Sequence, residues 1–263
     1  MVATPSPHSD FPVTRGLIAT LPTWVNQLAS LLPRPVPVPA QPRGFRWAYS
    51  DETAEVVQIA KAVRMVSGIA AAMHLADLGF TVECGTVLRT VSDFASEITF
   101  LAEGHLTGRM NPDQERFVKD FFKPMPTTPE ALEKWRREGY VGRGPIQKAH
   151  QRLVEKTTKS VGVFKDVQGL LTKAYDDYVH GSYLTAMSLF TGSTYRFMLG
   201  GHESPHHRCM MKVSVAGKLT EVLGTLGLMA VSRKQVPLVM TIRQAMHDLH
   251  ASNEDSGDDC PDE

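Results

Sequence analysis

The chain has 263 residues, of which 42% are hydrophobic and 21% charged, so it is long enough to bury one substantial core in a single main domain. Its formal charge is zero, but six acidic residues and no basic ones follow Asn253, which leaves an excess of about six positive charges on the remainder. The basic residues are scattered and do not form the dense Lys/Arg stripe of a dedicated nucleic-acid binder, although their excess permits weak attraction to phosphate.

The N-terminal part predicts one helix followed by an extended linker. Residues 17–32 place apolar side chains three and four positions apart, the pattern of a short amphipathic helix. Prolines recur through residues 33–42, which forbids a helix and favours an extended polyproline spacer. The helix is therefore tethered, and it can dock on its own domain or on another subunit.

Residues 50–102 predict two long antiparallel helices. Ser50 is a suitable N-cap, and the acidic residues that follow it lie at the positive end of the helix dipole. Gly79 interrupts the pattern, and the next helix carries apolar residues at alternating steps of four and three: Val87, Val91, Phe94, Ile98 and Leu101.

The rest of the chain alternates polar and helical stretches. Residues 103–160 are polar and broken, with short helices expected at 112–122 and 129–138, each opened by a proline, and a third over 143–159. Two more long helices are predicted, over 166–190 and 205–231, and a last one over 238–250. No alternating run is long enough to predict a sheet.

These elements predict an all-α fold, a bundle of four long helices with additional short helices. We divide the chain into residues 1–49, an N-terminal amphipathic helix and proline-rich linker, and residues 50–251, the bundle. Residues 103–160 form an irregular helical insertion in the bundle. Residues 252–263 are expected to be a disordered acidic tail, because they have too few apolar side chains to fold.

The cysteines and the N-terminus both bear on the compartment. Cys84, Cys209 and Cys260 are odd in number, far apart and form no CxxC pair, which favours a reducing compartment. Residues 1–16 contain Asp10 and several prolines where a signal peptide needs a basic flank and an apolar run. We therefore expect a cytoplasmic protein.

Two uncharged stretches, 16–33 and 178–195, approach the length that spans a membrane. The first contains Pro22 and Asn26, and the second contains His180, glycines and hydroxyl side chains. Since a bilayer requires about 20 mostly apolar residues, we interpret both as ordinary amphipathic segments and expect no membrane contact.

Among the common catalytic motifs, no Rossmann or Walker glycine pattern and no GxSxG occurs. Residues 202–209 gather His202, Glu203, His206, His207 and Cys209, which are reasonable zinc ligands. The letters of residues 202–206 match HExxH, but Pro205 and the preceding glycines favour a turn over the helix that this zinc motif needs, and Arg208 would place a cation beside the metal. We favour a solvated turn between helices, and expect no metal and no cofactor.

Two helical patterns supply candidate site residues. Charged residues recur every four positions along one side of a helix: Arg89, Asp93 and Glu97. If that side faces solvent, they form a surface charge ladder; if it is covered, Arg89 is buried and needs an acidic partner. Tyr178 and His180 lie in a segment of three tyrosines and two aspartates, where His180 is either a hydrogen-bonded structural residue or a group for proton transfer or phosphate contact. We predict that Arg89, Asp93, Tyr178 and His180 converge in one pocket.

The Arg89-Thr-Val-Ser-Asp93 helix and the later Tyr-Asp-Asp-Tyr-Val-His180-Gly element resemble an uncharacterised bacterial family of all-helical domains. That family is similar in architecture to HEPN domains, in which an arginine and a histidine cleave RNA without metal. The resemblance implies a general-base role for His180 and charge stabilisation by arginine. The sequence departs from the HEPN motif at Lys173, which stands where that motif requires arginine.

The sequence favours a binding or regulatory module of unassigned activity, and an HEPN-like metal-independent ribonuclease or phage-defence component is the alternative. Whether the protein is an enzyme is left open. RNA, a second copy of the chain and a protein partner held through the N-terminal helix all remain compatible with the sequence.

Overall fold

The computed structural model describes residues 11–39, 44–123, 128–138, 141–157, 178–179, 187, 189–191, 196–201, 204–256 and 260. Most of the helix predicted over 166–190 lies outside these residues.

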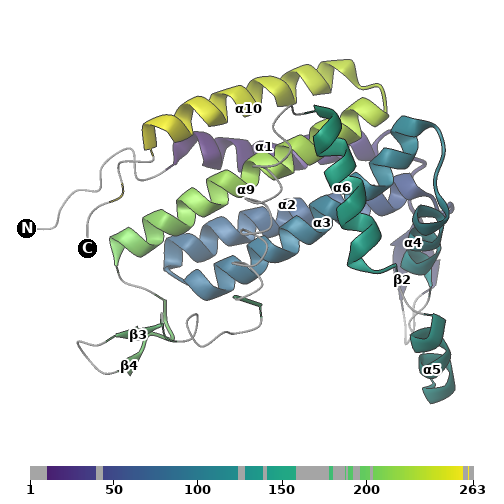
Figure 1. Ribbon diagram of the computed structural model, residues 1–263, viewed down its shortest axis with the longest axis horizontal. Helices are drawn as coiled ribbons and strands as arrows, with labels where there is room; N and C mark the ends of the chain where they lie inside the picture. Colours follow the sequence, from purple (N-terminus) through teal and green to yellow (C-terminus); the bar gives the residue numbers. More distant parts are fainter. Residues whose placement is uncertain are drawn as a thin grey trace, which may run out of the picture.

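Long helices form the bundle, which confirms the predicted all-α fold (Figure 1). Among the described residues the five longest are α1 (Pro12–Ala29), α2 (Ala54–Leu78), α3 (Thr81–Thr107), α9 (Pro205–Ser232) and α10 (Val236–Ser256). The predicted pair of long helices is α2 and α3, which pack along each other. Helix α9 contacts α1, α2, α3 and α10, so it lies at the centre of the bundle.

The ends of α2 follow from capping chemistry. The helix begins after Thr53, whose side chain accepts a hydrogen bond from the Val56 amide, and not after the predicted Ser50. It ends at Gly79, as predicted, where φ is 78°. Only glycine adopts this left-handed conformation without a steric cost, and it closes the last turn before α3 starts.

Apolar side chains from the five helices share one core. Ile69, Leu88, Leu219 and Leu226 are completely buried in it. Helices α2 and α3 approach closely at Gly68, where an added Cβ would lie 2.8 Å from a methyl carbon of Val91. The missing side chain therefore sets the spacing of this helix pair.

Helix α1 docks on its own bundle, which settles the alternative that the sequence left open. It contacts α2, α9 and α10 and buries Leu21, Trp24, Val25 and Leu28. The Arg15 guanidinium donates two hydrogen bonds to the Asp77 carboxylate of α2, at 2.9 and 2.6 Å. An apolar face and one ion pair thus hold α1 in place.

The Asp77 carboxylate makes stability depend on acidity. Burial alone would raise its pKa, but hydrogen bonds from Arg15 and Lys212 outweigh burial, so the pKa of Asp77 lies below its ordinary value. The stabilisation is therefore present above about pH 4 and is lost as the pH falls through the lowered pKa. We expect Asp77→Asn to be less stable than the wild type at pH 7, and the difference to shrink below about pH 4. Urea unfolding at these pH values measures the difference in unfolding free energy between the two proteins. A difference that does not change with pH would contradict the lowered pKa of Asp77.

Three shorter helices follow α3, namely α4 (Pro112–Phe122), α5 (Pro129–Glu138) and α6 (Arg143–Thr157). Helices α4 and α6 pack on the bundle, whereas α5 lies away from it (Figure 1). The sequence predicts all three positions closely. Helix α4 starts with a reciprocal capping box between Asn111 and Gln114, whose side chain also donates to the Phe100 carbonyl. Helix α6 is held to α3 by a bidentate pair between Arg152 and Glu103, with both distances 2.7 Å.

Two short hairpins depart from the prediction that the chain contains no sheet. Strands β1 (Val36–Pro39) and β2 (Phe45–Ala48) pair antiparallel, and so do β3 (Phe190–Thr191) and β4 (Arg196–Phe197). These strands are too short to leave a visible alternating pattern in the sequence. The proline run is extended as expected, but it is half of a hairpin and not a free spacer.

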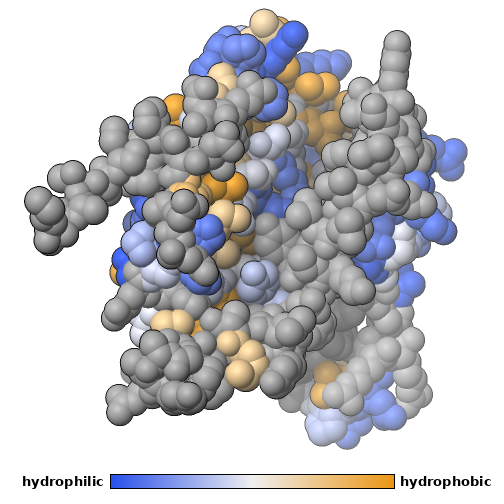
Figure 2. Space-filling view, turned by 60° about the vertical axis from the view of Figure 1, so that its left-hand side comes forward, coloured by the Kyte–Doolittle hydropathy of each residue, from blue (hydrophilic) through white to orange (hydrophobic). Residues whose placement is uncertain are grey.

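Two described helices, α2 and α9, are long and apolar enough to cross a membrane by length and composition. Their most apolar windows are 56% and 50% buried inside the bundle, as in the core helices of many globular proteins, so this is weak evidence for a membrane span. On the face shown in Figure 2, the apolar residues of the described part form small areas between hydrophilic ones.

Candidate functional site

Arg89 and Asp93 lie on a covered side of α3. The Arg89 residue is 5% exposed, and its Nη1 lies 2.5 Å from Oδ1 of Asp93, one turn further along the helix. Of the two alternatives that the sequence offered, the structure thus shows a buried arginine with an acidic partner. A guanidinium in this position needs such a partner, because an unpaired buried charge is costly.

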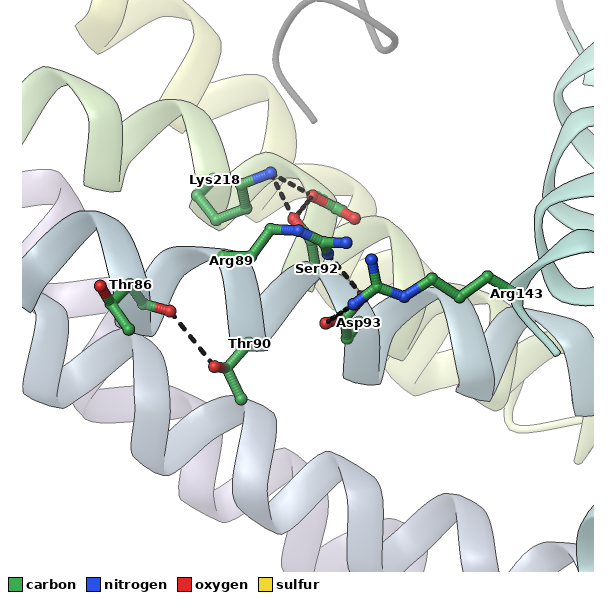
Figure 3. A network of polar contacts seen from close by, with 8 residues as sticks. Thr86, Arg89, Thr90, Ser92, Asp93, Arg143 and Lys218 are labelled. Carbon is green, nitrogen blue, oxygen red and sulfur yellow. Dashed lines mark hydrogen bonds and ion pairs between the residues drawn. The ribbon is translucent and has the colours of Figure 1, made fainter. Parts of the chain in front are cut away.

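Further polar groups extend this pair into a network across three helices (Figure 3). Arg143 of α6 approaches Asp93 at 3.5 Å. The Lys218 ammonium of α9 donates to the Ser92 hydroxyl and the Glu221 carboxylate, each at 2.6 Å. The network therefore links α3, α6 and α9 through paired charges, an arrangement that orders the helices.

Tyr178 lies one turn away from this network. An added Cβ on Gly85 would lie 2.6 Å from the Tyr178 ring, so the ring packs directly on the α3 backbone. Burial, and then the nearby Cys84 thiol, raise the pKa of Tyr178. Tyr178 and Arg89 therefore meet neighbouring turns of α3, whereas His180 lies outside the described residues, and the convergence of all four stays a prediction.

The partner of Glu97 is a residue that the sequence did not single out. Lys61 of α2 lies 2.7 Å from Glu97 and over the rings of three phenylalanines, 5.3 to 5.8 Å from their centroids. The rings are those of Phe94, Phe117 and Phe121. Glu97 is thus half of an interhelical pair and not a step in a surface ladder, and no spacing within one helix could reveal this.

A cavity of about 400 Å³ lies where α1 and α9 end and α2 begins. Arg233 lines it and donates to the carbonyls of Leu28 and Glu55 and to the Gln58 amide oxygen, at 3.1 to 3.3 Å. Burial lowers the pKa of Arg233, while Glu55 and Tyr49 counteract this effect. The guanidinium closes the C-terminal end of α1, where a cation is favoured, so its role is structural.

Next to this cavity, the β1–β2 hairpin exposes aromatic side chains. Phe45 is 63% and Trp47 65% exposed, and their rings meet edge to face at 5.7 Å. Pro37 pairs with Trp47 and Pro39 with Phe45, so all four side chains share one side of the hairpin. We call these four residues the aromatic hairpin face. The proline run reads as a linker in the sequence and hides this face, although Phe-x-Trp after Gly44 is a strand-like signal.

The cysteines depart from their expected state. Cys209 at the start of α9 forms a disulfide with Cys260, while Cys84 is free and buried, and burial raises its pKa to about 12. The cysteines therefore no longer favour a reducing compartment, because a separation of 51 residues in sequence says nothing about distance in the fold. The cytoplasmic location stays a prediction without support from the cysteines.

The disulfide also bears on the segment 202–209. Cys209 is no longer available as a thiolate ligand, and His207 lies in the first turn of α9, where its amide donates to the Ser204 side chain. His202 and Glu203 lie outside the described residues. Within the part of the chain that the structure describes, no group of three or more His, Cys, Asp or Glu side chains could hold a metal ion.

Comparison with known proteins finds no match to this chain among protein-family models, curated proteins or solved structures.

Proposed function

We propose that the protein is a non-catalytic binding module that acts through the aromatic hairpin face. The observation that carries the proposal is the exposure of Phe45 and Trp47, 63% and 65%, on a hairpin at the end of the bundle where α2 begins (Figure 1). Leaving a large apolar side chain in water forgoes about 1.5–3 kcal/mol of burial. Adjacent exposed aromatic rings of this kind are typical of contact surfaces.

The polar network on α3 supports binding over catalysis. A ribonuclease of HEPN type would need its arginine to meet a phosphate, whereas Arg89 is buried and bonded to Asp93. Lys218 is likewise buried and bonded to Ser92 and Glu221. Groups that are held by each other inside the bundle stabilise it and are poorly placed to act on a substrate.

The proposal is tested by the accessibility of the hairpin in cells. A Pro37→Cys variant keeps both rings and adds a reactive thiol, and its labelling is read from the peptide that contains it, so that Cys84, Cys209 and Cys260 do not contribute in either setting. We expect maleimide to label this thiol about tenfold more slowly in permeabilised cells of the source organism than in the purified protein, since a bound partner would exclude the reagent.

The matched control is Val63→Cys, a position that is 50% exposed and lies more than two turns into α2, outside the hairpin. Its labelling rate should be the same in both settings. Equal rates in cells and in purified protein at both positions would reject the binding function of the hairpin.

A further inference from the structure

We propose that the partner of the aromatic hairpin face is a lipid bilayer with anionic headgroups, into whose interfacial layer Phe45 and Trp47 insert. This inference rests on the proposed function and adds the class of partner. Tryptophan suits the interface because its apolar ring contacts the acyl chains while its N–H stays at the level of the headgroups. Phe45 packs edge to face on Trp47, so both rings would enter together.

The charge of the hairpin matches an anionic surface. The segment 33–50 contains Arg34, Arg43 and Arg46 and no acidic residue. Arg34 and Arg46, the two that the structure describes, are exposed. Arg46 pairs with Val38 and so projects from the opposite side of the hairpin to the rings, from where its long side chain can reach the headgroup phosphates when the hairpin enters the interface edge-on. Basic residues near an inserted aromatic pair are attracted to the negative surface potential of such a bilayer.

The size of the hairpin favours a bilayer over a protein partner. Each strand has four residues, whereas a stable protein interface buries about 800 Å² on each side. The free edge of β1 also carries Pro37 and Pro39, which lack the amide hydrogens that an added strand would need. Insertion of two rings into an interface requires neither a large area nor a backbone partner.

The ring geometry favours lipid over single-stranded nucleic acid. Successive bases stack on aromatic side chains whose faces they can cover in sequence. The planes of Phe45 and Trp47 are 89° apart, so the two rings cannot present parallel faces to neighbouring bases. The arginines alone would attract an anionic bilayer and a nucleic acid alike, so the geometry of the rings is what favours the bilayer.

This contact is peripheral and differs from a membrane span. Helices α2 and α9 keep about half of their most apolar windows buried in the bundle, and only the hairpin would enter the bilayer interface. The sequence-based expectation of no membrane contact considered only segments long enough to cross the bilayer. A short aromatic hairpin cannot cross a bilayer, but it can contact the bilayer surface.

Vesicle flotation of the full-length protein tests the proposal. Vesicles of phosphatidylcholine with phosphatidylglycerol should bind the protein at about 0.1 M salt, and vesicles of phosphatidylcholine alone should bind it at least tenfold less. Trp47→Ser should lower the partition coefficient about tenfold or more. Arg34→Gln with Arg46→Gln should lower it by roughly fivefold per arginine. Leu199→Ser, at a position 80% exposed outside the hairpin, should change nothing.

A second readout locates the ring in the bilayer. With Trp135→Phe in both proteins, lipids brominated on the acyl chain should quench the tryptophan fluorescence of the protein that keeps Trp47, and this quenching should largely disappear when Trp47→Phe is added, because the remaining Trp24 is buried in the bundle.

Absence of binding to anionic vesicles, or binding that is indifferent to Trp47→Ser, would overturn the lipid assignment. If Pro37→Cys were still protected in cells, the binding function would stand with another class of partner. Saturable binding of a single-stranded oligonucleotide that Trp47→Ser abolishes, without flotation, would assign that partner to nucleic acid. If the thiol is not protected in cells and the protein does not float with vesicles, both proposals are rejected.

Discussion

Reducing the Cys209–Cys260 disulfide is expected to lower the free energy of unfolding by about 4 kcal/mol. The bond joins the start of α9 to the chain beyond α10 across 51 residues, and it restricts the unfolded chain much more than the folded one. For a chain of this size the loss should lower the melting temperature by roughly 10 °C. Thermal and urea unfolding with and without a reductant measure the effect.

The matched variant is Cys260→Ser, which should unfold at the same temperature with and without reductant and should resemble the reduced wild type. Cys84 does not complicate the comparison, because it is buried and forms no disulfide. A wild-type melting temperature that ignores the reductant would show that the bond adds no stability. Because cytosolic thiols are kept reduced, the protein would have its lower stability in the cytoplasm and its higher stability in an oxidising compartment.

Leu226→Ala is expected to destabilise the protein by about 2–5 kcal/mol. Leu226 is fully buried in α9, the helix that contacts α1, α2, α3 and α10, so the neighbouring side chains cannot all move to fill the space that the substitution leaves. Urea unfolding followed by circular dichroism measures the change. The slope with urea should stay the same, because the fold is retained.

Val231→Ala on the same helix is the control, since Val231 is 47% exposed and lies one to two turns further along. We expect its effect to stay within about 0.5 kcal/mol, because a surface substitution of this kind removes little buried area. Similar losses for both variants would contradict the central position of α9.

The disulfide prediction and the hairpin predictions concern separate parts of the molecule. The disulfide lies where α9 begins, whereas the hairpin precedes α2 at the end of the bundle where α9 ends. Substitutions of Trp47 or Arg46, which are exposed, should therefore leave the unfolding free energy nearly unchanged. A loss of vesicle binding in these variants would then reflect the surface and not the fold.

The local sequence predicts most of the helices because their signals are local. Apolar residues returning once per turn mark α2, α3 and α9, and Gly79 marks the end of α2 through its left-handed conformation. Prolines in the first turn mark α4 and α5. The start of α2 is misplaced by three residues because Ser50 and Thr53 are both suitable caps, and only the backbone path chooses between them.

The candidate site is predictable only in part. The four-residue spacing of Arg89 and Asp93 is visible in the sequence, and the structure shows them paired. Their links to Arg143 and Lys218 join residues far apart in the chain, and no helical periodicity connects such residues. The same holds for Lys61 and Glu97, and for the aromatic hairpin face, whose strands are each too short to identify alone.

Composition, periodicity and turn residues by themselves determined three properties: the helical-bundle fold, the positions of most helices and the apolar faces of those helices. Each of these properties depends on neighbours within a few residues along the chain. The tertiary structure alone decided that α1 docks on its own bundle, that Cys209 meets Cys260, that Arg89 is buried and that Trp47 is exposed. The physical reason is that burial and pairing depend on which surfaces meet in space, and many side chains that are equivalent by local pattern differ only in what packs against them.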